Sequence, residues 1–311
     1  MARDGEGERE LTRDAAKGSG RKGGASPRRA APPGRGPRPA AASEGKPRPQ
    51  PAKKAPRPTE GPEQGQTPSF RRPAAELVAL FGFHAVREAL RVKRRKLLDI
   101  YATQAAADRL EGEIANAGLR PHIVQPEDLT HRLGATAAHQ GLMLEARPLE
   151  PIDLSEISSR SGVVLVLDQI TDPHNVGAIL RTAAAFGVDA LVTTERHAPE
   201  MAGVLAKAAS GGLEHVDVVA VVNLSRALQE LGEMGYQRIG LDSEAPVDFA
   251  ELRLRRPVAL ALGGEGKGLR RLTKENCDDL ARLDMPGPIK SLNVSNACAV
   301  ALTLTLRRLG I

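Results

Sequence analysis

The stretch VVLVLDQITDPHNVGAILRTAAAFG, residues 163–187, places a strand, a loop and a helix in immediate succession. Its first eight residues, VVLVLDQI, begin with a run of five apolar residues, which is typical of a strand that is buried on both faces of a sheet. The helix that follows carries four apolar residues at helical spacing: Val176, Ile179, Leu180 and Ala183. The stretch therefore predicts one strand-loop-helix unit of an α/β domain.

The same alternation continues toward the C-terminus. Further strands are expected near ALVTT, VDVVAV, RIGLD and VALALGG, with a helix over NLSRALQELGEMG between two of them. Apolar strands that alternate with helices predict a parallel sheet covered on both faces. Ligands of such sheets bind at the carboxyl ends of the strands, so three loops at that edge become candidates for function.

Two other segments precede this domain. Residues 74–151 predict a small α/β domain, with helices around HAVREALRV and from Gln104, strands at LLDIYAT, PHIVQ and GLMLEAR, and one further short helix. Residues 149–162 are rich in turn formers and predict a linker.

The chain has no Trp, two Tyr and five Phe, so any RNA binding must depend on charge, shape and backbone contacts instead of base stacking.

Residues 1–72 have the composition of a disordered basic tail. They hold 12 of the 23 prolines and 11 of the 31 glycines, and they carry 17 basic against 8 acidic residues. Their charge is therefore +9, whereas the rest of the chain is 27 minus 30, or −3. Such a segment cannot bury enough apolar surface to fold alone. It would either attract a polyanion such as RNA or serve as a solubilising leader.

Several classes of protein are disfavoured by the sequence. Four acidic residues among the first ten argue against a mitochondrial transit peptide, and no apolar run reaches the roughly 18 residues of a membrane span. Cys277 and Cys298 form neither a disulfide framework nor a zinc pattern, so no metal is expected. We expect a cytoplasmic protein without a membrane partner.

The first candidate loop leads into the helix of the opening stretch. Asn175 stands where the N-cap of that helix is expected, and Arg181 lies off its apolar stripe. Taken alone, Asn175 is most simply a cap and Arg181 a solvated charge.

The second loop, in LALGGEGKGLRRLT, is rich in glycine. The residue after Lys267 is Gly268, so the pattern of a P-loop fails, and Leu269 stands where a dinucleotide fingerprint needs its third glycine. What remains is a loop that can bring bare backbone close to a ligand, with Glu265 at its centre. A simple tight turn is the alternative.

The third loop opens KSLNVSNACAVALTLTLRR, residues 290–308. Its apolar run is too short to span a bilayer, and it predicts a helix with the stripe Ala297, Val300, Ala301 and Leu304. Ser291, Asn293 and Ser295 crowd the start of that helix. One of them is expected to cap it, and the others could hold polar ligand atoms.

Together, DPHNVGAILRTAAAFGV, LALGGEGKGL and MPGPIKSLNVSNACAVAL closely resemble, in order and spacing, the three motifs of the SpoU, or TrmH, family of RNA 2′-O-ribose methyltransferases. The segment from FGFHAVREAL to HQGLMLEA is similar to that family's substrate-binding domain, which is related to RNA-binding ribosomal proteins. The resemblance covers the chain after the tail, and with the composition it gives three expected parts: a disordered tail over 1–72, an RNA substrate-binding domain over 74–151, and a catalytic domain over 162–311.

The resemblance also implies a SPOUT-type fold, in which the parallel sheet ends in a C-terminal trefoil knot. It implies S-adenosylmethionine as cofactor, held by backbone groups of Gly263, Leu283 and Leu292, and a homodimer whose active sites use both subunits. Five residues fall on the polar positions that the family uses in catalysis: Asn175, Arg181, Glu265, Ser291 and Asn293.

These residue types suit methyl transfer to a ribose hydroxyl. The reaction is an in-line displacement, so alignment comes first, and the attacking oxygen gains negative charge as it loses its proton. An arginine hardly ever gives up a proton, so Arg181 is expected to act electrostatically on phosphate or on the developing alkoxide. By analogy with the family, the ribosomal-protein-like domain favours a guanosine of 23S rRNA over tRNA. A noncatalytic ribosome-assembly factor is the less favoured alternative.

Overall fold

The computed structural model of the protein describes residues 77–196 and 198–311. The predicted basic tail, residues 1–72, lies outside the described residues.

The first described domain contains a four-stranded sheet. Its strand order is β1-β4-β2-β3, in which β4 pairs antiparallel with β1 and β2 while β3 pairs parallel with β2. Its elements are β1 (Val78–Phe81), α1 (Phe83–Val92), β2 (Leu97–Ala102), α2 (Gln104–Arg109), α3 (Glu111–Asn116), β3 (Pro121–Ile123), α4 (Pro126–Leu133) and β4 (Leu142–Ala146).

The predicted elements of this domain are confirmed, with two differences. The helix expected from Gln104 is divided into α2 and α3 at Leu110, and its residues Ala107, Leu110 and Ile114 are buried. Strand β1 was not predicted, because four residues are too few to display a periodic pattern.

The second domain contains a seven-stranded sheet of order β7-β6-β5-β10-β8-β11-β9, and every paired strand in it is parallel. This confirms the predicted parallel sheet. Its elements are β5 (Val163–Asp168), α5 (Pro173–Ala185), β6 (Ala190–Thr194), α6 (Gly203–Ala208), η2 (Gly212–Glu214), β7 (Asp217–Val221), α7 (Leu224–Glu233), β8 (Gln237–Leu241), β9 (Val247–Asp248), η3 (Phe249–Glu251), β10 (Val258–Gly263), α8 (Arg271–Glu275), β11 (Asp279–Arg282) and α9 (Val294–Leu309).

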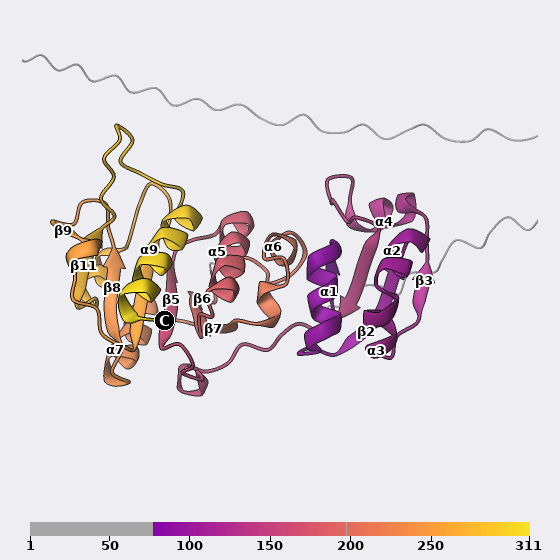
Figure 1. Ribbon diagram of the computed structural model, residues 1–311, viewed down its shortest axis with the longest axis horizontal. Helices are drawn as coiled ribbons and strands as arrows, with labels where there is room; N and C mark the ends of the chain where they lie inside the picture. The colour runs from indigo at the N-terminus through magenta and orange to yellow at the C-terminus, as the bar shows by residue number, and fades with distance from the viewer. Residues whose placement is uncertain (1–76, 197) are drawn as a thin grey trace, which may run out of the picture. The chain divides into compact units, whose positions relative to one another are not determined.

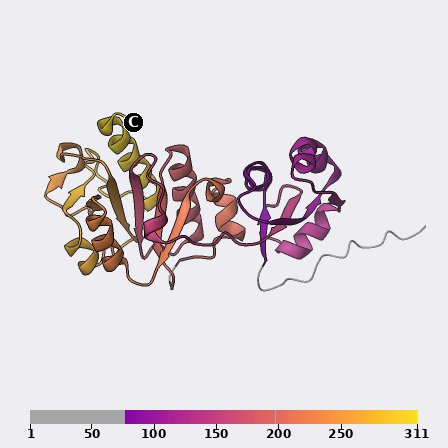
Figure 2. The same ribbon diagram turned by 90° about the horizontal axis from the view of Figure 1, so that it is seen from below.

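Helices cover both faces of the seven-stranded sheet, as predicted (Figures 1 and 2). Successive side chains of a strand point to opposite faces. Leu165 and Leu167 of β5 accordingly pack in the cluster that contains α5 and α9, whereas Val164 and Val166 pack in the cluster that contains α7. The uninterrupted apolar run of β5 is therefore explained by burial on two sides.

The predicted cap of α5 is wrong. The N-cap is Asp172, whose carboxylate accepts hydrogen bonds from the backbone N–H groups of His174 and Asn175. Pro173 fits the first helical position because it needs no N–H partner there, so the helix begins earlier than expected. The side chain of Asn175 is consequently available for other contacts.

The predicted stripe of α9 is also largely wrong. Of its four residues only Ala301 is fully buried, and Val300 is 41% exposed. The face that packs on the sheet carries Val294, Cys298, Ala301, Leu302, Thr305 and Leu306. The helix is apolar on more than one side, so sequence periodicity did not distinguish the face that packs inside the chain from the other apolar face.

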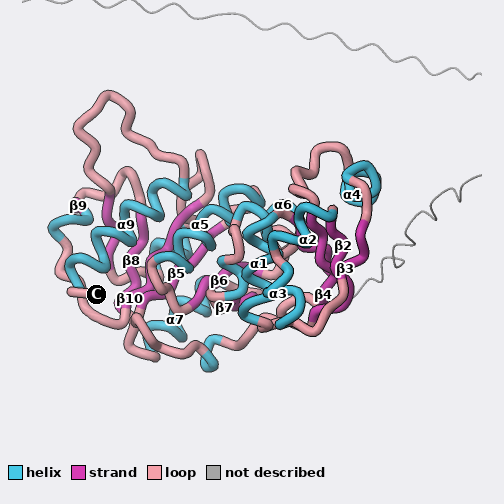
Figure 3. Tube along the Cα trace, turned by 45° about the vertical axis from the view of Figure 1, so that its right-hand side comes forward, coloured by secondary structure: helices cyan, strands magenta, loops and turns pink. Residues whose placement is uncertain are grey.

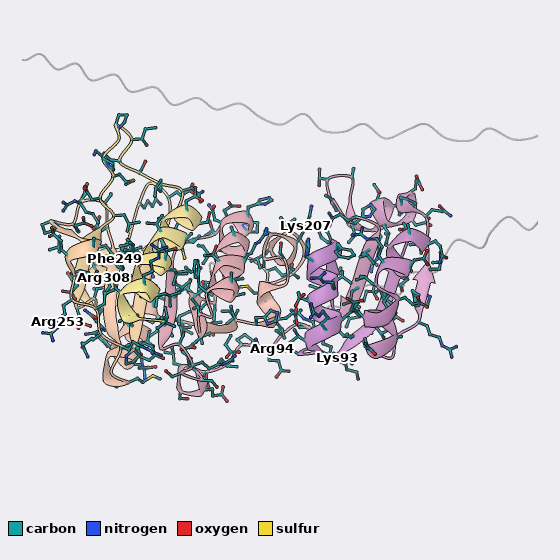
Figure 4. The ribbon with its side chains drawn as sticks, viewed as in Figure 1. Lys93, Arg94, Lys207, Phe249, Arg253 and Arg308 are labelled. Atoms are coloured by element: carbon teal, nitrogen blue, oxygen red, sulfur yellow. The ribbon has the colours of Figure 1, made fainter. Side chains whose placement is uncertain are left out.

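The C-terminal end of α9 is attached to the loop after β9. Arg308 donates hydrogen bonds to the backbone oxygens of Phe249, at 2.8 Å, and Leu252 (Figure 4). A cation at the C-terminal end of a helix also interacts favourably with the helix dipole. The structure adds direct bonds to two carbonyl groups of a neighbouring element.

The predicted linker is packed against the second domain. It contains a short helix, η1 (Leu154–Glu156), and Leu154 and Ile157 are buried in the cluster under α7. A buried ion pair also joins the two domains, since Arg95 Nη2 lies 2.7 Å from Glu214 Oε1.

Within the described ranges, no helix combines the length and the apolar character that crossing a bilayer requires.

Candidate active site

A cavity of about 280 Å³ lies at the carboxyl ends of β8, β10 and β11. The loops after these strands and the start of α9 form its walls, and the loop between β11 and α9 extends from this edge of the sheet (Figure 3). Parallel α/β sheets bind ligands at this edge. The cavity therefore lies at the edge of the sheet where the sequence predicted a ligand site.

Glycine backbone forms one wall of this cavity. A Cβ atom at Gly263 would lie 2.1 Å from the backbone carbon of Gly268, and one at Gly264 would lie 2.5 Å from the backbone oxygen of Gln169. No side chain fits at either position. Both glycines thus let the backbone come directly to the cavity wall, which is the use that the sequence predicted for this loop.

Three predicted polar residues form one hydrogen-bond network beside the cavity. Asn175 Nδ2 and Asn293 Nδ2 both donate to Glu265 Oε1, at 3.0 and 2.7 Å. Asn293 Nδ2 also lies 2.9 Å from the acceptor Asn175 Oδ1. The three side chains come from α5, the glycine-rich loop and the start of α9, so only the tertiary fold brings them together.

Asn293 has a second role as a helix cap. The sequence predicted this role for one of the three residues Ser291, Asn293 and Ser295. It is the N-cap of α9, where its Oδ1 accepts hydrogen bonds from the N–H and the hydroxyl of Ser295. Capping uses the amide oxygen, and the amide nitrogen remains for Glu265. The cap therefore fixes the orientation of the side chain that meets the network.

The other predicted residues of the third loop line the cavity itself. Leu283, Ser291 and Leu292 are part of its wall, together with Gly263 and Glu265. Leu292 is 42% exposed although it is apolar. The cavity wall is thus a mixture of backbone, apolar side chains and a few polar groups, as is usual for small-molecule sites.

Arg181 lies away from this network. It lines a different cavity of about 650 Å³, together with His174, Lys207 and Ser210. Arg181 is exposed, as its place off the apolar stripe predicted. Within one chain, the structure does not bring it to Glu265.

Asp242 was not predicted as a site residue, yet it lines the cavity at the end of β8. Burial raises the pKa of its carboxyl group, but hydrogen bonds from Lys274 and the Glu244 N–H lower it, and the net pKa is below the usual value. Lys274 Nζ lies 2.5 Å from Asp242 Oδ2. The rule that ligands meet strand ends would have identified Asp242, which is the last residue of the predicted strand RIGLD.

Two family models together match most of the described chain. Residues 162–303 match the SpoU rRNA methylase family, and residues 79–152 match the model for RNA 2′-O ribose methyltransferase substrate binding. The 23S rRNA (guanosine-2′-O-)-methyltransferase RlmB of Nitrosomonas europaea is 37% identical over 236 residues, which are 74% of this chain and 91% of the relative. The chain belongs to the SpoU rRNA methylase family. The resemblance predicted from three motifs is thereby confirmed, as is the class of enzyme.

Other similar proteins agree with this family. RlmB of Pseudomonas aeruginosa is 38% identical over 238 residues, covering 74% of this chain and 96% of the relative. A solved RNA 2′-O ribose methyltransferase has a TM-score of 0.62 at 25% identity and covers 76% of this chain and 90% of its own. The SpoU methyltransferase AviRb from Streptomyces viridochromogenes, solved with AdoMet, has a TM-score of 0.64 at 20% identity over 75% of this chain and 91% of its own. This last likeness supports the fold alone.

Proposed function

We propose that this SpoU-family chain transfers a methyl group from S-adenosylmethionine to the ribose 2′-hydroxyl of a guanosine in 23S rRNA. The observation that carries the proposal is the Asn175–Glu265–Asn293 network beside the glycine-walled cavity. The names of the RlmB relatives, of which this chain covers 91% and 96%, favour the guanosine and the large-subunit RNA. Such a substrate implies a cytoplasmic enzyme.

The residues of the cavity fit S-adenosylmethionine. Its walls offer bare backbone at Gly263 and Gly264 and the carboxylate of Asp242, groups that suit an adenosine and a cationic amino acid. Gly263, Leu283 and Leu292 would contribute the backbone contacts. When bound, the cofactor supplies the methyl group on a positively charged sulfur.

The network would align the acceptor ribose. Glu265 Oε1 is held by two amide donors, which orients the carboxylate. Within residues 77–196 and 198–311, Glu265 Oε2 accepts no hydrogen bond, so it can accept one from a ligand hydroxyl or ammonium group. Ser291 would add a hydroxyl on the same wall. Alignment of the two reactants is the largest demand of an in-line transfer.

Arg181 would complete the site from a second copy of the chain. In that role its guanidinium would grip a phosphate next to the target ribose and stabilise the developing alkoxide. Arg181 lines a different cavity from Glu265 within one chain, which supports a site shared between subunits, because the family-equivalent residue would otherwise have no reacting group to touch.

The outer face of α9 supports a homodimer. Val300 is 41% exposed, and Ala297 and Leu304 on the same helix are only partly buried. A second copy would cover these apolar side chains next to the proposed site. Val300→Asp should shift the protein from dimer to monomer in sedimentation analysis and abolish turnover. A fully dimeric V300D protein would contradict this interface.

We further propose the domain boundaries and the trefoil knot that the family resemblance implies. Residues 74–151 would bind RNA, and residues 162–311 would catalyse the transfer. The knot is supported by the position of β10 between β5 and β8, while α9, which follows the outer strand β11, returns to pack against α5. An experimental chain trace tests it. A chain trace in which the C-terminal segment does not thread through a loop would contradict the knot.

The decisive test is methyl transfer to RNA that lacks the mark. Labelled S-adenosylmethionine should label 23S rRNA from a strain without this protein, and mapping should place the 2′-O-methyl group on a guanosine. Label that appears in tRNA instead would show that tRNA, and not 23S rRNA, is the substrate. If the protein binds the cofactor but no RNA of that strain accepts a methyl group, the protein is a noncatalytic RNA-binding factor.

A further inference from the structure

Asp168 is a buried acid beside the cofactor cavity for which the proposed mechanism has no use. It is the last residue of β5, its exposed fraction is 0%, and it pairs in register with Gly263 of β10. A buried carboxylate is costly unless hydrogen bonds compensate it. Its partners therefore indicate what it does.

The carboxylate of Asp168 is bound to the segment that follows the glycine-rich loop. Oδ2 accepts hydrogen bonds from Arg270 N, at 2.9 Å, and from the hydroxyl of Thr273, at 2.7 Å. Oδ1 accepts one from Arg270 Nε at 2.6 Å. Thr273 is itself fully buried, with an exposed fraction of 0%.

The backbone of Asp168 is bound to the start of the same loop. Its carbonyl oxygen accepts a hydrogen bond from Gly264 N at 2.9 Å. The loop is then closed on itself, because Gly268 N donates to Gly264 O at 2.9 Å. One residue thus holds both ends of the loop that carries Glu265 at its tip and glycine backbone on the cavity wall.

We infer that Asp168 is a positioning residue for the cofactor site: it anchors the loop of residues 263–269 at both ends and so sets the place of the glycine backbone and of Glu265. The inference rests on the proposed function for the identity of the ligand, S-adenosylmethionine. Asp168 does not line the cavity, so its effect passes through the loop.

The first test is Asp168→Asn in the full-length protein. Asparagine has nearly the same shape but only one acceptor oxygen, so it cannot accept all three hydrogen bonds. Loss of one buried charged hydrogen bond should weaken S-adenosylmethionine binding about tenfold or more. Calorimetry measures the affinity, and amide hydrogen exchange measures the opening of residues 263–269 without any ligand.

Asp189 offers a matched control. It is also a buried aspartate, 3% exposed, and its carboxylate accepts backbone hydrogen bonds from Ser161 and Gly162 at 2.8 and 2.7 Å. These bonds lie at the amino end of β5, the edge away from the cavity. Asp189→Asn should lower the melting temperature comparably while leaving cofactor affinity and the exchange of the glycine-rich loop unchanged.

Thr273 allows a second pair of variants. Thr273→Val removes the hydroxyl donor to Asp168 while it keeps the side-chain shape, and it should weaken binding in the same direction as D168N. Thr273→Ser keeps the hydroxyl and should restore the affinity. General loosening of the core would not be corrected by a serine, which is smaller than valine.

The outcomes separate the inference from the proposed function. If D168N and D189N have equal affinity and equal loop exchange, the anchoring role is wrong. If the wild-type protein does not bind S-adenosylmethionine, the proposed function fails. The exchange of residues 263–269 in the two variants would still decide whether Asp168 anchors the loop.

Discussion

Asn175 and Arg181 lie on one helix, α5, but they have different surroundings. Asn175 is bonded to Glu265 and Asn293 across the end of the sheet, whereas Arg181 faces another cavity. Both were predicted as catalytic residues from motif position. Within one chain the structure brings only Asn175 into the network. A variant of Arg181 therefore tests most directly whether the site is shared between subunits.

Replacement of Arg181 by Ala should reduce methyl transfer by roughly 100-fold or more, the usual effect of losing a group that stabilises transition-state charge. The melting temperature should hardly change, because Arg181 is exposed and lies off the buried stripe. Single-turnover assays with 23S rRNA measure the loss. Arg226→Ala on α7, whose side chain is 78% exposed, is the control. Near-normal turnover of R181A would end its proposed role.

Cys298 makes a prediction about alkaline pH. Burial raises the pKa of this thiol from 9.0 to about 12. The unfolded chain therefore loses the proton at lower pH than the folded chain, so the stabilisation is complete below pH 9 and is lost as the pH rises toward about 12. Between these values each such thiol lowers the free energy of unfolding by up to about 1.4 kcal/mol per pH unit.

Urea denaturation at about pH 8 and about pH 10 measures this loss. Cys298→Ala should reduce the difference in unfolding free energy between the two conditions, whatever its effect on stability at the lower pH. Cys277, whose pKa burial also raises to about 12, should account for a second part of the loss. A C298A variant with the same pH dependence as the wild type would contradict the assignment.

At the scale of elements, the start of α5 determines where Asn175 lies. Asp172 caps the helix through two backbone N–H groups, one of which belongs to Asn175 itself. The residue that the motif identified as a candidate cap is therefore held by the true cap. Because of this connection, we expect the cap to affect catalysis as well as stability.

Removal of that cap should have both effects. Asp172→Ala should lower the free energy of unfolding by about 1 kcal/mol, the typical cost of a lost N-cap. It should also reduce methyl transfer, because the first turn that carries Asn175 loses its anchor. Asn223 is the matched control, since it caps α7 through Ser225 N and Arg226 N. Asn223→Ala should cost similar stability and leave turnover unchanged; equal losses of turnover would contradict the link.

At the scale of the whole molecule, charge is divided unequally along the chain. Residues 1–72 carry +9, and the remainder carries −3. The predicted tail lies outside the described residues, so its role depends on solution experiments. The division itself favours an electrostatic contact of the tail with the phosphate backbone of RNA.

Removal of residues 1–72 should weaken RNA binding and make it less sensitive to salt. The slope of log affinity against log salt should become shallower by roughly 0.9 for each duplex phosphate that the protein no longer neutralises, and by somewhat less with single strands. Filter binding over a salt series measures it, and cofactor affinity should not change. Unchanged RNA binding would make the tail a solubilising leader.

The sequence by itself determined the fold class and most of the candidate site. The apolar run of β5 and the stripe of α5 required a parallel sheet covered on both faces, because only burial accounts for such patterns. The three motifs carried the polar residues of the network and the glycine loop, because local chemistry restricts which residues can serve there. Elements without a clear pattern, such as β1 and the edge strand β9, were not predicted.

Only the tertiary structure decided which surfaces meet. It showed that Asp172 caps α5, that the inner face of α9 is the one with Cys298, and that Asp242 and Asp168 lie at the ends of β8 and β5, the two strands on either side of β10. It also separated Arg181 from the network formed by Asn175. The physical reason is that helical periodicity identifies apolar faces but not their partners, and hydrogen bonds between distant residues exist only after the strands have been ordered in the sheet.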